Sequence, residues 1–245
     1  GDRMKPEDRQ RAGQIARQAA QAAFAGRAVQ ITEYGARAGS AACQTAAIQA
    51  AIDRMSEEGG GHVVVPEGRF VTGALRLKSG VDLHLQSKGS RLVFTTEINE
   101  TNYPLTETRW EGSACINYSP LIYAEGAKNI GLTGPGTLDG QAGAGAWWSW
   151  HHQVENAWSH DLPDLQSPAR SRLRAMDEAG VPLKRRVFGP GEYLRPNFIQ
   201  LLRCQNVLIE GVTLVRSPMW QLNPVCCRNV VVRGVTFDSH GPNND

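Results

Sequence analysis

The sequence has few cysteines, almost no net charge and no long apolar segment. Its five cysteines are an odd number with no dense disulfide framework, so they do not define a compartment. The net charge of +2 is too small to indicate a nucleic-acid partner. No apolar run approaches the length of a membrane span, so we expect no membrane-spanning helix. The cysteines and the pair His151 and His152 lack zinc-site spacing, and we expect neither metal nor cofactor.

What the chain does contain is the composition of a folded protein built from short elements. Apolar residues make up 41% and charged residues 20%, which fits a folded chain rather than a disordered one. The 26 glycines and 13 prolines supply the turns that many short strands require. A chain of 245 residues is long enough to bury one large core.

A hexapeptide that begins with asparagine and ends with glycine repeats along the chain. Asn-Val-Leu-Ile-Glu-Gly at 206–211 returns 23 residues later as Asn-Val-Val-Val-Arg-Gly at 229–234, and a looser copy stands at 129–134. A fixed period of this length indicates one supersecondary unit stacked on itself. The repeat is rich in β-branched residues and lacks the leucine ladder of leucine-rich repeats. We therefore expect an all-β fold, a right-handed parallel β-helix.

The N-terminal region is predicted to be helical. Residues 6–25 are rich in alanine, with acidic residues just after Pro6, but their apolar face is weak. This pattern favours a peripheral helix. We therefore assign residues 1–28 to an N-terminal extension and residues 29–245 to the β-helix.

A second predicted helix precedes the first strands of the solenoid. Residues 29–34 predict a strand, and residues 45–55 place apolar side chains at helical spacing until the glycines at 59–61 end the helix. Such a helix would cap the first coil, whose core and backbone would otherwise meet water.

Short strands and two interruptions follow. The strands are expected at residues 63–65, 74–77, 81–85 and 91–94. Residues 95–118 are expected to form a long loop, and residues 141–195 a second insertion with a helix at 167–179. Residues 197–239 return to regular repeats. Insertions in a solenoid map to loops on one face, which is often the binding face.

Several segments together match the motifs of one enzyme family. They are Ile-Thr-Glu-Tyr-Gly-Ala at 31–36, Thr-Ala-Ala-Ile-Gln-Ala-Ala-Ile at 45–52, Gly-Gly-Gly-His-Val-Val-Val-Pro at 59–66, Ser-Pro-Leu-Ile-Tyr at 119–123, Gly-Pro-Gly-Thr-Leu-Asp-Gly at 134–140 and Ser-Pro-Met-Trp at 217–220. The terminal Pro-Asn-Asn-Asp at 242–245 is similar to the family's first catalytic motif, usually Asn-Thr-Asp. On these residues the chain resembles glycoside hydrolase family 28, the polygalacturonases and relatives that cleave pectin.

The resemblance implies inverting hydrolysis of α-1,4-galacturonosyl linkages without a cofactor. Asp245 would be the catalytic carboxylate that helps to activate water, while a later aspartate would donate a proton to the leaving oxygen. Asn244 stands where the family has threonine. The family's two further aspartates, its histidine and its Arg-x-Lys substrate clamp would lie beyond residue 245, so we expect the 245-residue chain to be inactive by itself. The alternative role for Asp245 is a turn-capping carboxylate.

Five other residues are candidates for contacts with a galacturonate polysaccharide or oligosaccharide. Asn243 and His240 adjoin the terminal motif, although both residue types also suit a solvated turn. Gln221 and Asn223 alternate with the two apolar residues beside them, so one pair should face the core and the other the presumed cleft. Arg195 precedes the regular coils in a basic stretch that would attract a polyanion, or would simply be a solvated face.

Two rival functions remain open on sequence grounds. A noncatalytic β-helix that binds glycans or forms a structural spike needs the same coils without convergent carboxylates. A pectin lyase would keep the substrate class but use a basic residue and commonly calcium. For either enzyme the size of the polymer substrate predicts a secreted or periplasmic protein. The three tryptophans within residues 147–150 could stack on sugar rings or pack as a plug that anchors the second insertion.

Overall fold

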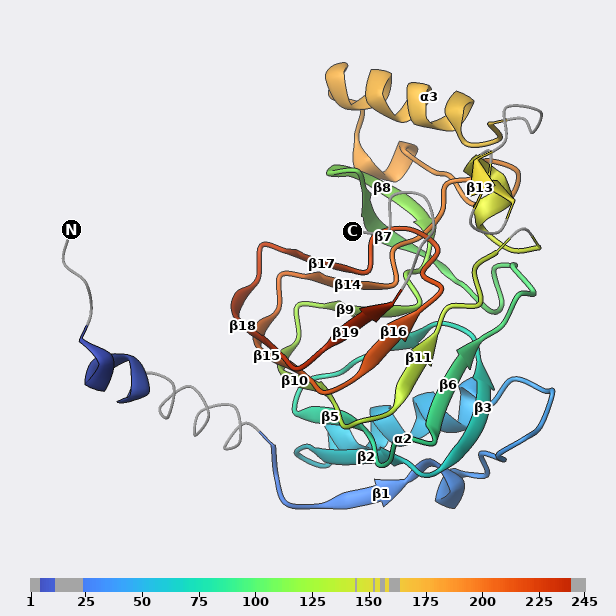
Figure 1. The fold of residues 1–245 in the computed structure, drawn as a ribbon. Helices are drawn as coiled ribbons and strands as arrows, with labels where there is room; N and C mark the ends of the chain where they lie inside the picture. The colour runs from blue at the N-terminus through green and yellow to red at the C-terminus, as the bar shows by residue number, and fades with distance from the viewer. Residues whose placement is uncertain are drawn as a thin grey trace.

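The chain winds through three parallel sheets in turn, and each complete coil gives one strand to each sheet (Figure 1). The structure is a computed structural model that describes residues 5–11, 24–143, 145–151, 153–154, 157–158 and 164–238. Strands one coil apart pair in parallel in every one of these sheets. The architecture is the right-handed parallel β-helix that the repeats predict.

The first wall of the solenoid has the strand order β1-β2-β5-β10-β15-β18. Its strands are β1 (Ala28–Gln30), β2 (Gly61–Val65), β5 (Val81–Leu85), β10 (Lys128–Thr133), β15 (Gln205–Glu210) and β18 (Arg228–Arg233). Side chains alternate between the two faces. On β5, for example, Val81, Leu83 and Leu85 point into the column and are fully buried, while Asp82 and His84 lie on the outer face.

The other two walls complete the column. The second, in the order β19-β16-β11-β6-β3, contains β3 (Gly68–Thr72), β6 (Ser90–Phe94), β11 (Thr137–Asp139), β16 (Thr213–Val215) and β19 (Thr236–Asp238). The third, in the order β17-β14-β9-β4, contains β4 (Leu75–Arg76), β9 (Ile122–Glu125), β14 (Ile199–Leu202) and β17 (Leu222–Val225). The four strands predicted between residues 63 and 94 are confirmed as β2, β4, β5 and β6.

Stacked apolar side chains fill the column from coil to coil. In the second wall Phe70 lies in register with Leu92, Leu92 with Leu138, and Leu138 with Leu214. All four side chains are fully buried. Burial of one such side chain stabilises the fold by roughly 1.5–3 kcal/mol relative to its exposure.

A period of 23 residues holds in all three walls of the last two coils. The pairs are Leu202 with Val225, Gln205 with Arg228, and Thr213 with Thr236. The same period relates Cys204 to Cys227. Cys204 is buried, Cys227 packs partly buried against the core, and both are free thiols.

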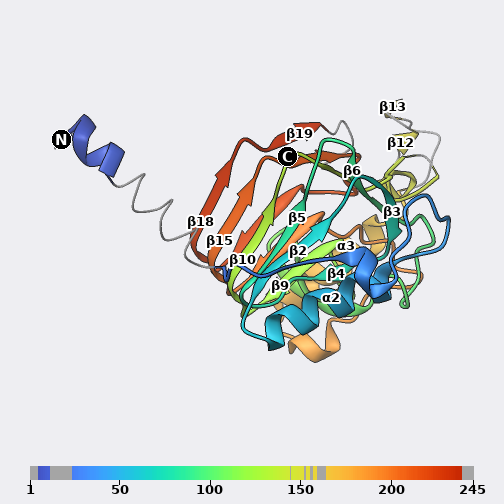
Figure 2. The same ribbon diagram turned by 90° about the horizontal axis from the view of Figure 1, so that it is seen from below.

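A helix closes the N-terminal end of the column, as predicted. Helix α2 (Thr45–Glu57) buries Ile48, Ile52 and Met55 and packs against β2, β4 and β5; Figure 2 shows it beneath these strands. The strand predicted at 29–34 is wrong beyond Gln30, where the 3-10 helix η1 (Ile31–Tyr34) begins. The Glu33 carboxylate accepts a hydrogen bond from the Gln30 N–H (2.7 Å), which favours the helical turn over an extended strand.

The predicted loop at 95–118 contains an antiparallel hairpin instead. Strands β7 (Leu105–Trp110) and β8 (Ser113–Tyr118) pair along their whole length. The two turn residues, Glu111 and Gly112, both have positive φ (46° and 88°), as a tight two-residue hairpin turn requires. Residues 106–109 are polar and show no alternation of apolar side chains that would predict a strand. They pack against residues distant in the sequence, such as Gln200.

The second insertion contains the predicted helix and lies beside the hairpin at one side of the column (Figure 1). Helix α3 (Ser167–Glu178) contacts β8. The smaller elements are η2 (Trp148–His151), β12 (Gln153–Val154), β13 (Ala157–Trp158) and η3 (Leu183–Arg185). A separate apolar cluster that includes Trp110, Leu173 and Phe188 joins the two insertions.

At the N-terminus, residues 6–11 are helical, and the remainder of the helix predicted at 6–25 falls mostly outside the described residues. The assignment of residues 1–28 and 29–245 to separate units stays a prediction. Among the helices that the structure describes, none is long and apolar enough to cross a membrane.

Candidate functional site

The outer face of the third wall carries a row of long polar side chains. Strand register places Arg76, Tyr123, Gln200 and Asn223 side by side on β4, β9, β14 and β17. The Arg76 guanidinium lies 5.3 Å from the centre of the Tyr123 ring. Because the neighbouring inward positions are apolar, this row forms the outer face of the third wall, and we call it the floor.

The hairpin β7–β8 covers the middle of that row. The Gln200 side-chain oxygen accepts hydrogen bonds from the Thr108 hydroxyl and from the Arg109 N–H (3.1 Å), and its nitrogen donates to the Arg109 carbonyl (3.1 Å). The Tyr123 hydroxyl donates to the Glu107 carbonyl (2.8 Å). Gln200 is fully buried as a result, so the floor is closed over β9 and β14.

Charged side chains link the hairpin to the coils below it. The Arg203 guanidinium contacts the Glu107 carboxylate at 2.9 Å and the Glu125 carboxylate at 3.0 Å, and Arg76 lies 3.7 Å from Glu125. The hydrogen bond from Arg203 lowers the pKa of Glu107. These groups are partly exposed, and their main effect is to position the hairpin rather than to add much stability.

The basic stretch of the second insertion is paired within the protein. The Glu111 carboxylate forms ion pairs with the guanidinium groups of Arg170 (3.1 Å) and Arg174 (3.4 Å). Arg186 contacts Asp177 at 2.7 Å. Of the two interpretations of this stretch, an internally neutralised surface therefore fits these arginines better than an open cationic rim.

Arg195, predicted to contact substrate, is fully buried. Its Nε donates to the Gln166 side-chain oxygen (3.0 Å), and another guanidinium nitrogen donates to the Pro218 carbonyl (3.0 Å). Burial lowers the pKa of the guanidinium. The prediction that Arg195 lies on an exposed rim is therefore wrong, because it connects the insertion to the turn before β17.

The tryptophans of the second insertion form the packed plug rather than a sugar platform. Trp147 is fully buried and meets the Tyr103 and Trp150 rings edge-on, with centroids 5.3 and 5.0 Å away. The Trp148 indole N–H donates to the Ser217 carbonyl (2.9 Å), which ties the plug to the loop before β17.

Of the remaining predicted site residues, two are described by the structure. Asn223 is partly exposed on the outer face of β17, whereas Gln221, just before that strand, is buried. Leu222, between them, packs against the core. His240, Asn243 and Asp245 lie outside the described residues, so their roles stay predictions.

Metal-binding groups do not gather anywhere in the described residues. No group of three or more His, Cys, Asp or Glu side chains there is arranged to hold a metal ion. All five cysteines are free thiols. The floor of the third wall itself presents amide, hydroxyl and charged side chains.

The stacked coils, the helical cap and the one-sided insertions define a right-handed parallel β-helix of the pectin-lyase-like class. The chain matches no profile of a known protein family. It is 38% identical to a hyperthermoactive exopolygalacturonase from Thermotoga maritima, with a TM-score of 0.83 over 94% of this chain and 52% of the relative.

Two curated relatives agree with this likeness. The chain is 27% identical to a probable polygalacturonase from Vitis vinifera and 26% identical to an exo-poly-alpha-D-galacturonosidase from Dickeya chrysanthemi. Each alignment covers 88% of this chain but only 38% and 37% of the respective relatives. The predicted resemblance to the polygalacturonases is confirmed, and the chain spans less than half the length of these curated relatives.

Proposed function

We propose that this chain is the N-terminal part of a galacturonan hydrolase, with the groove on the third wall as its substrate face. The observation that carries the proposal is the position of Asn223, a partly exposed polar residue on β17, just beyond the part of the floor that the hairpin covers. A strict period of 23 residues would place Asp245 over Leu222, which packs against the core, whereas a turn two residues longer would place it over Trp220, which packs against the apolar cluster of the insertions. We infer the longer turn, which puts the Asp245 carboxylate on the side of the hairpin. Asp245 would thus enter the site from the next coil.

In this proposal Asp245 helps to activate a water molecule on the far side of the glycosidic bond. A second carboxylate, supplied by later coils, protonates the leaving oxygen, which gives inversion at the anomeric carbon. Asn243 and His240, which precede Asp245 in the sequence, contact the sugar in this proposal, as does Asn223. Because a galacturonan polymer does not enter cells readily, the protein would act after export, in the periplasm or outside the cell.

The hairpin also suggests where the enzyme attacks its substrate. Thr108, Arg109 and Glu107 fill the groove over β14 and β9, so a sugar chain cannot continue along the floor in that direction. A groove blocked at one end accepts the end of a polymer rather than its middle. The proposed activity is accordingly release of short products from a chain end.

A chimera tests the catalytic assignment. Residues 1–245 are joined to the C-terminal segment of the Thermotoga maritima relative that follows the aligned position. We expect release of reducing sugar from polygalacturonate, mainly as short products, and a fall in kcat of about 10³-fold for Asp245→Asn, because a positioned base contributes on that scale. Asp238→Asn, an acidic residue of the last described strand, is the matched control and should retain activity.

Circular dichroism and thermal unfolding must first show that the chimera and both variants are folded. A folded chimera that binds polygalacturonate without cleaving it would favour the noncatalytic glycan-binding alternative. Unsaturated products that absorb in the ultraviolet would identify a lyase instead. Equal losses for Asp245→Asn and Asp238→Asn would contradict the role given to Asp245.

A further inference from the structure

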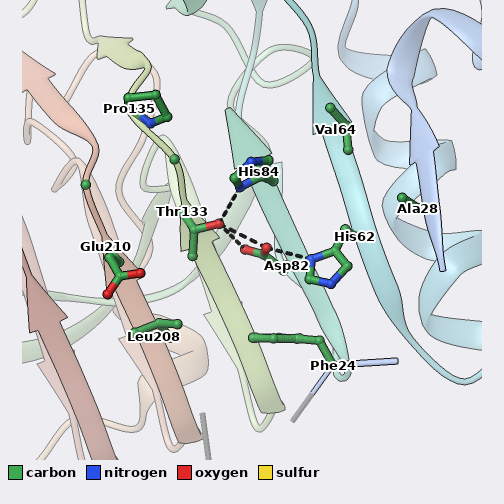
Figure 3. A pocket seen from close by; sticks show the side chains of 12 residues that line it. Phe24, Ala28, His62, Val64, Asp82, His84, Thr133, Pro135, Leu208 and Glu210 are labelled. Atoms are coloured by element: carbon green, nitrogen blue, oxygen red, sulfur yellow. Dashed lines mark hydrogen bonds and ion pairs between the residues drawn. The ribbon is translucent and has the colours of Figure 1, made fainter. Parts of the chain in front are cut away.

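A pocket lies on the outer face of the first wall, a different sheet from the third wall. It encloses about 710 Å³, within the range of sites for small organic molecules. Two rows of outward side chains form its floor, and they are His62, Asp82 and Leu208 in one row and Val64, His84, Thr133 and Glu210 in the other. Gly131, which has no side chain, lies in register between Asp82 and Leu208. Phe24, Ala28 and Pro135 stand at its sides (Figure 3).

Gly131 makes the hollow possible. A Cβ atom built on this residue would lie 2.6 Å from the Asp82 Oδ1 and 2.8 Å from the edge of the Phe24 ring. The missing side chain leaves room for that ring and the carboxylate to approach each other. The ring of Phe24 also lies near that of His62, with centroids 5.8 Å apart.

One hydrogen-bonded network runs across three neighbouring strands of the pocket. The His62 Nδ1 lies 2.8 Å from the Asp82 Oδ2, and the Thr133 hydroxyl lies 2.9 Å from each Asp82 oxygen. The His84 Nδ1 lies 2.8 Å from the Thr133 hydroxyl oxygen (Figure 3). Asp82 itself is 3% exposed, so its carboxylate depends on these partners.

The network sets the tautomer of both histidines. An ionised Asp82 can only accept, so the His62 Nδ1–H and the Thr133 hydroxyl both donate to it. The single hydroxyl proton of Thr133 is then used, and the His84 Nδ1–H must donate to the threonine oxygen. Each neutral imidazole therefore keeps its Nε2 as a hydrogen-bond acceptor. Two acceptors with fixed tautomers on adjacent strands suit the hydroxyl groups of a ligand.

Charge and shape narrow the ligand class. None of the twelve residues that line the pocket is lysine or arginine, and Asp82 and Glu210 contribute carboxylates. A carboxylated sugar would meet like charges there, whereas an uncharged ring could place its C–H face on Phe24 and Leu208. We propose that this pocket binds an uncharged sugar ring, through hydroxyl groups that donate to His62 and His84.

The proposal is independent of the hydrolase assignment, because the pocket uses a different sheet and no terminal residue. The test titrates the 245-residue protein with methyl β-D-galactopyranoside and, separately, with D-galacturonate, at about pH 8.5, because the raised pKa of His62 would leave its imidazole partly protonated near neutral pH. Saturation-transfer NMR and the His62 and His84 ring-proton shifts report binding. We expect millimolar binding of the neutral glycoside, typical of a single small ring, and at least about tenfold weaker binding of the acid.

Two variants that add a positive charge test whether the charge of the pocket determines its preference for the neutral glycoside. Leu208→Arg introduces a cation at the pocket floor and should improve galacturonate binding relative to the neutral glycoside. Thr236→Arg adds the same charge at an exposed position on β19 and should change neither affinity. If the wild-type protein binds neither probe, or binds the acid as well as the neutral glycoside, the proposal is overturned. This wild-type comparison decides the matter even if Leu208→Arg does not fold.

Discussion

At the scale of single residues, the leading asparagine of each repeat has a structural explanation. Asn129, Asn206 and Asn229 all adopt positive φ, between 57° and 59°, where asparagine is tolerated better than most residues. The Asn206 Nδ2 donates to the Asn129 Oδ1 (3.0 Å), and the Asn229 Nδ2 donates to the Asn206 Oδ1 (2.7 Å). The asparagines thus form a ladder of side-chain amides at one corner of the column.

Two substitutions of Asn206, the central asparagine, separate the contribution of its side-chain hydrogen bonds from that of its left-handed backbone conformation. Asn206→Ala removes two hydrogen bonds and places alanine in a left-handed conformation, so we expect a loss of about 2–3 kcal/mol in the free energy of unfolding. Asn206→Gly keeps the conformation and loses only the bonds, so its loss should be about half as large. Urea unfolding monitored by circular dichroism measures both. Equal losses for the two variants would show that the backbone conformation contributes nothing.

At the scale of elements, one buried carboxylate joins three strands that are far apart in sequence. Asp82 on β5 is hydrogen-bonded to His62 on β2 and to Thr133 on β10, so the network joins three successive coils. The hydrogen bond to Asp82 raises the pKa of His62. A histidine whose pKa is raised by folding stabilises the fold most when it is protonated.

Because the pKa of His62 is raised, the stability of the fold should depend on pH. The stabilisation from the His62–Asp82 pair should be fully present below the ordinary histidine pKa of 6.5 and should be lost as the pH rises through the raised value. His62→Gln should therefore lower Tm more at about pH 5.5 than at about pH 8.5. In an Asp82→Asn background the same substitution should show no such difference. A larger effect of His62→Gln at alkaline pH would contradict the argument.

At the scale of the whole molecule, the last described coil has no further coil stacked on it within the described residues. Strands β17, β18 and β19 each pair with a strand on one side only within the described residues. Val232 on β18 and Phe237 on β19 are 41% and 45% exposed. Unpaired strand edges with apolar side chains favour association with another chain.

We accordingly expect the 245-residue chain to self-associate as its concentration rises. Val232→Lys combined with Phe237→Lys should suppress this association, because charged side chains at a strand edge oppose pairing. Val187→Lys is the control, since Val187 is 45% exposed but lies outside this coil. Size-exclusion chromatography with light scattering measures the mass. A monomeric wild-type chain, or equal suppression by the control, would contradict the edge as the cause.

Sequence patterns predicted the coils and the helix of the second insertion well but missed the hairpin of the first insertion. The helix at 167–179, the capping helix and the four early strands are confirmed, because their periodicities lie within one element. The hairpin at 105–118 was missed, since its Glu111-Gly112 turn and polar strand carry no strong local signal. Gln200 was missed as well, because nothing in its own strand distinguishes an amide that binds a hairpin about ninety residues earlier in the chain.

The sequence by itself determined the parallel β-helix, its period and its resemblance to the polygalacturonases. Those features depend on turn residues and β-branched side chains that recur at a fixed local spacing. Only the tertiary structure decided that Arg195 is buried, that the hairpin covers part of the third wall, and that His62, Asp82 and Thr133 meet on one face. These outcomes depend on contacts between coils and insertions, which the winding of the chain brings together from distant positions.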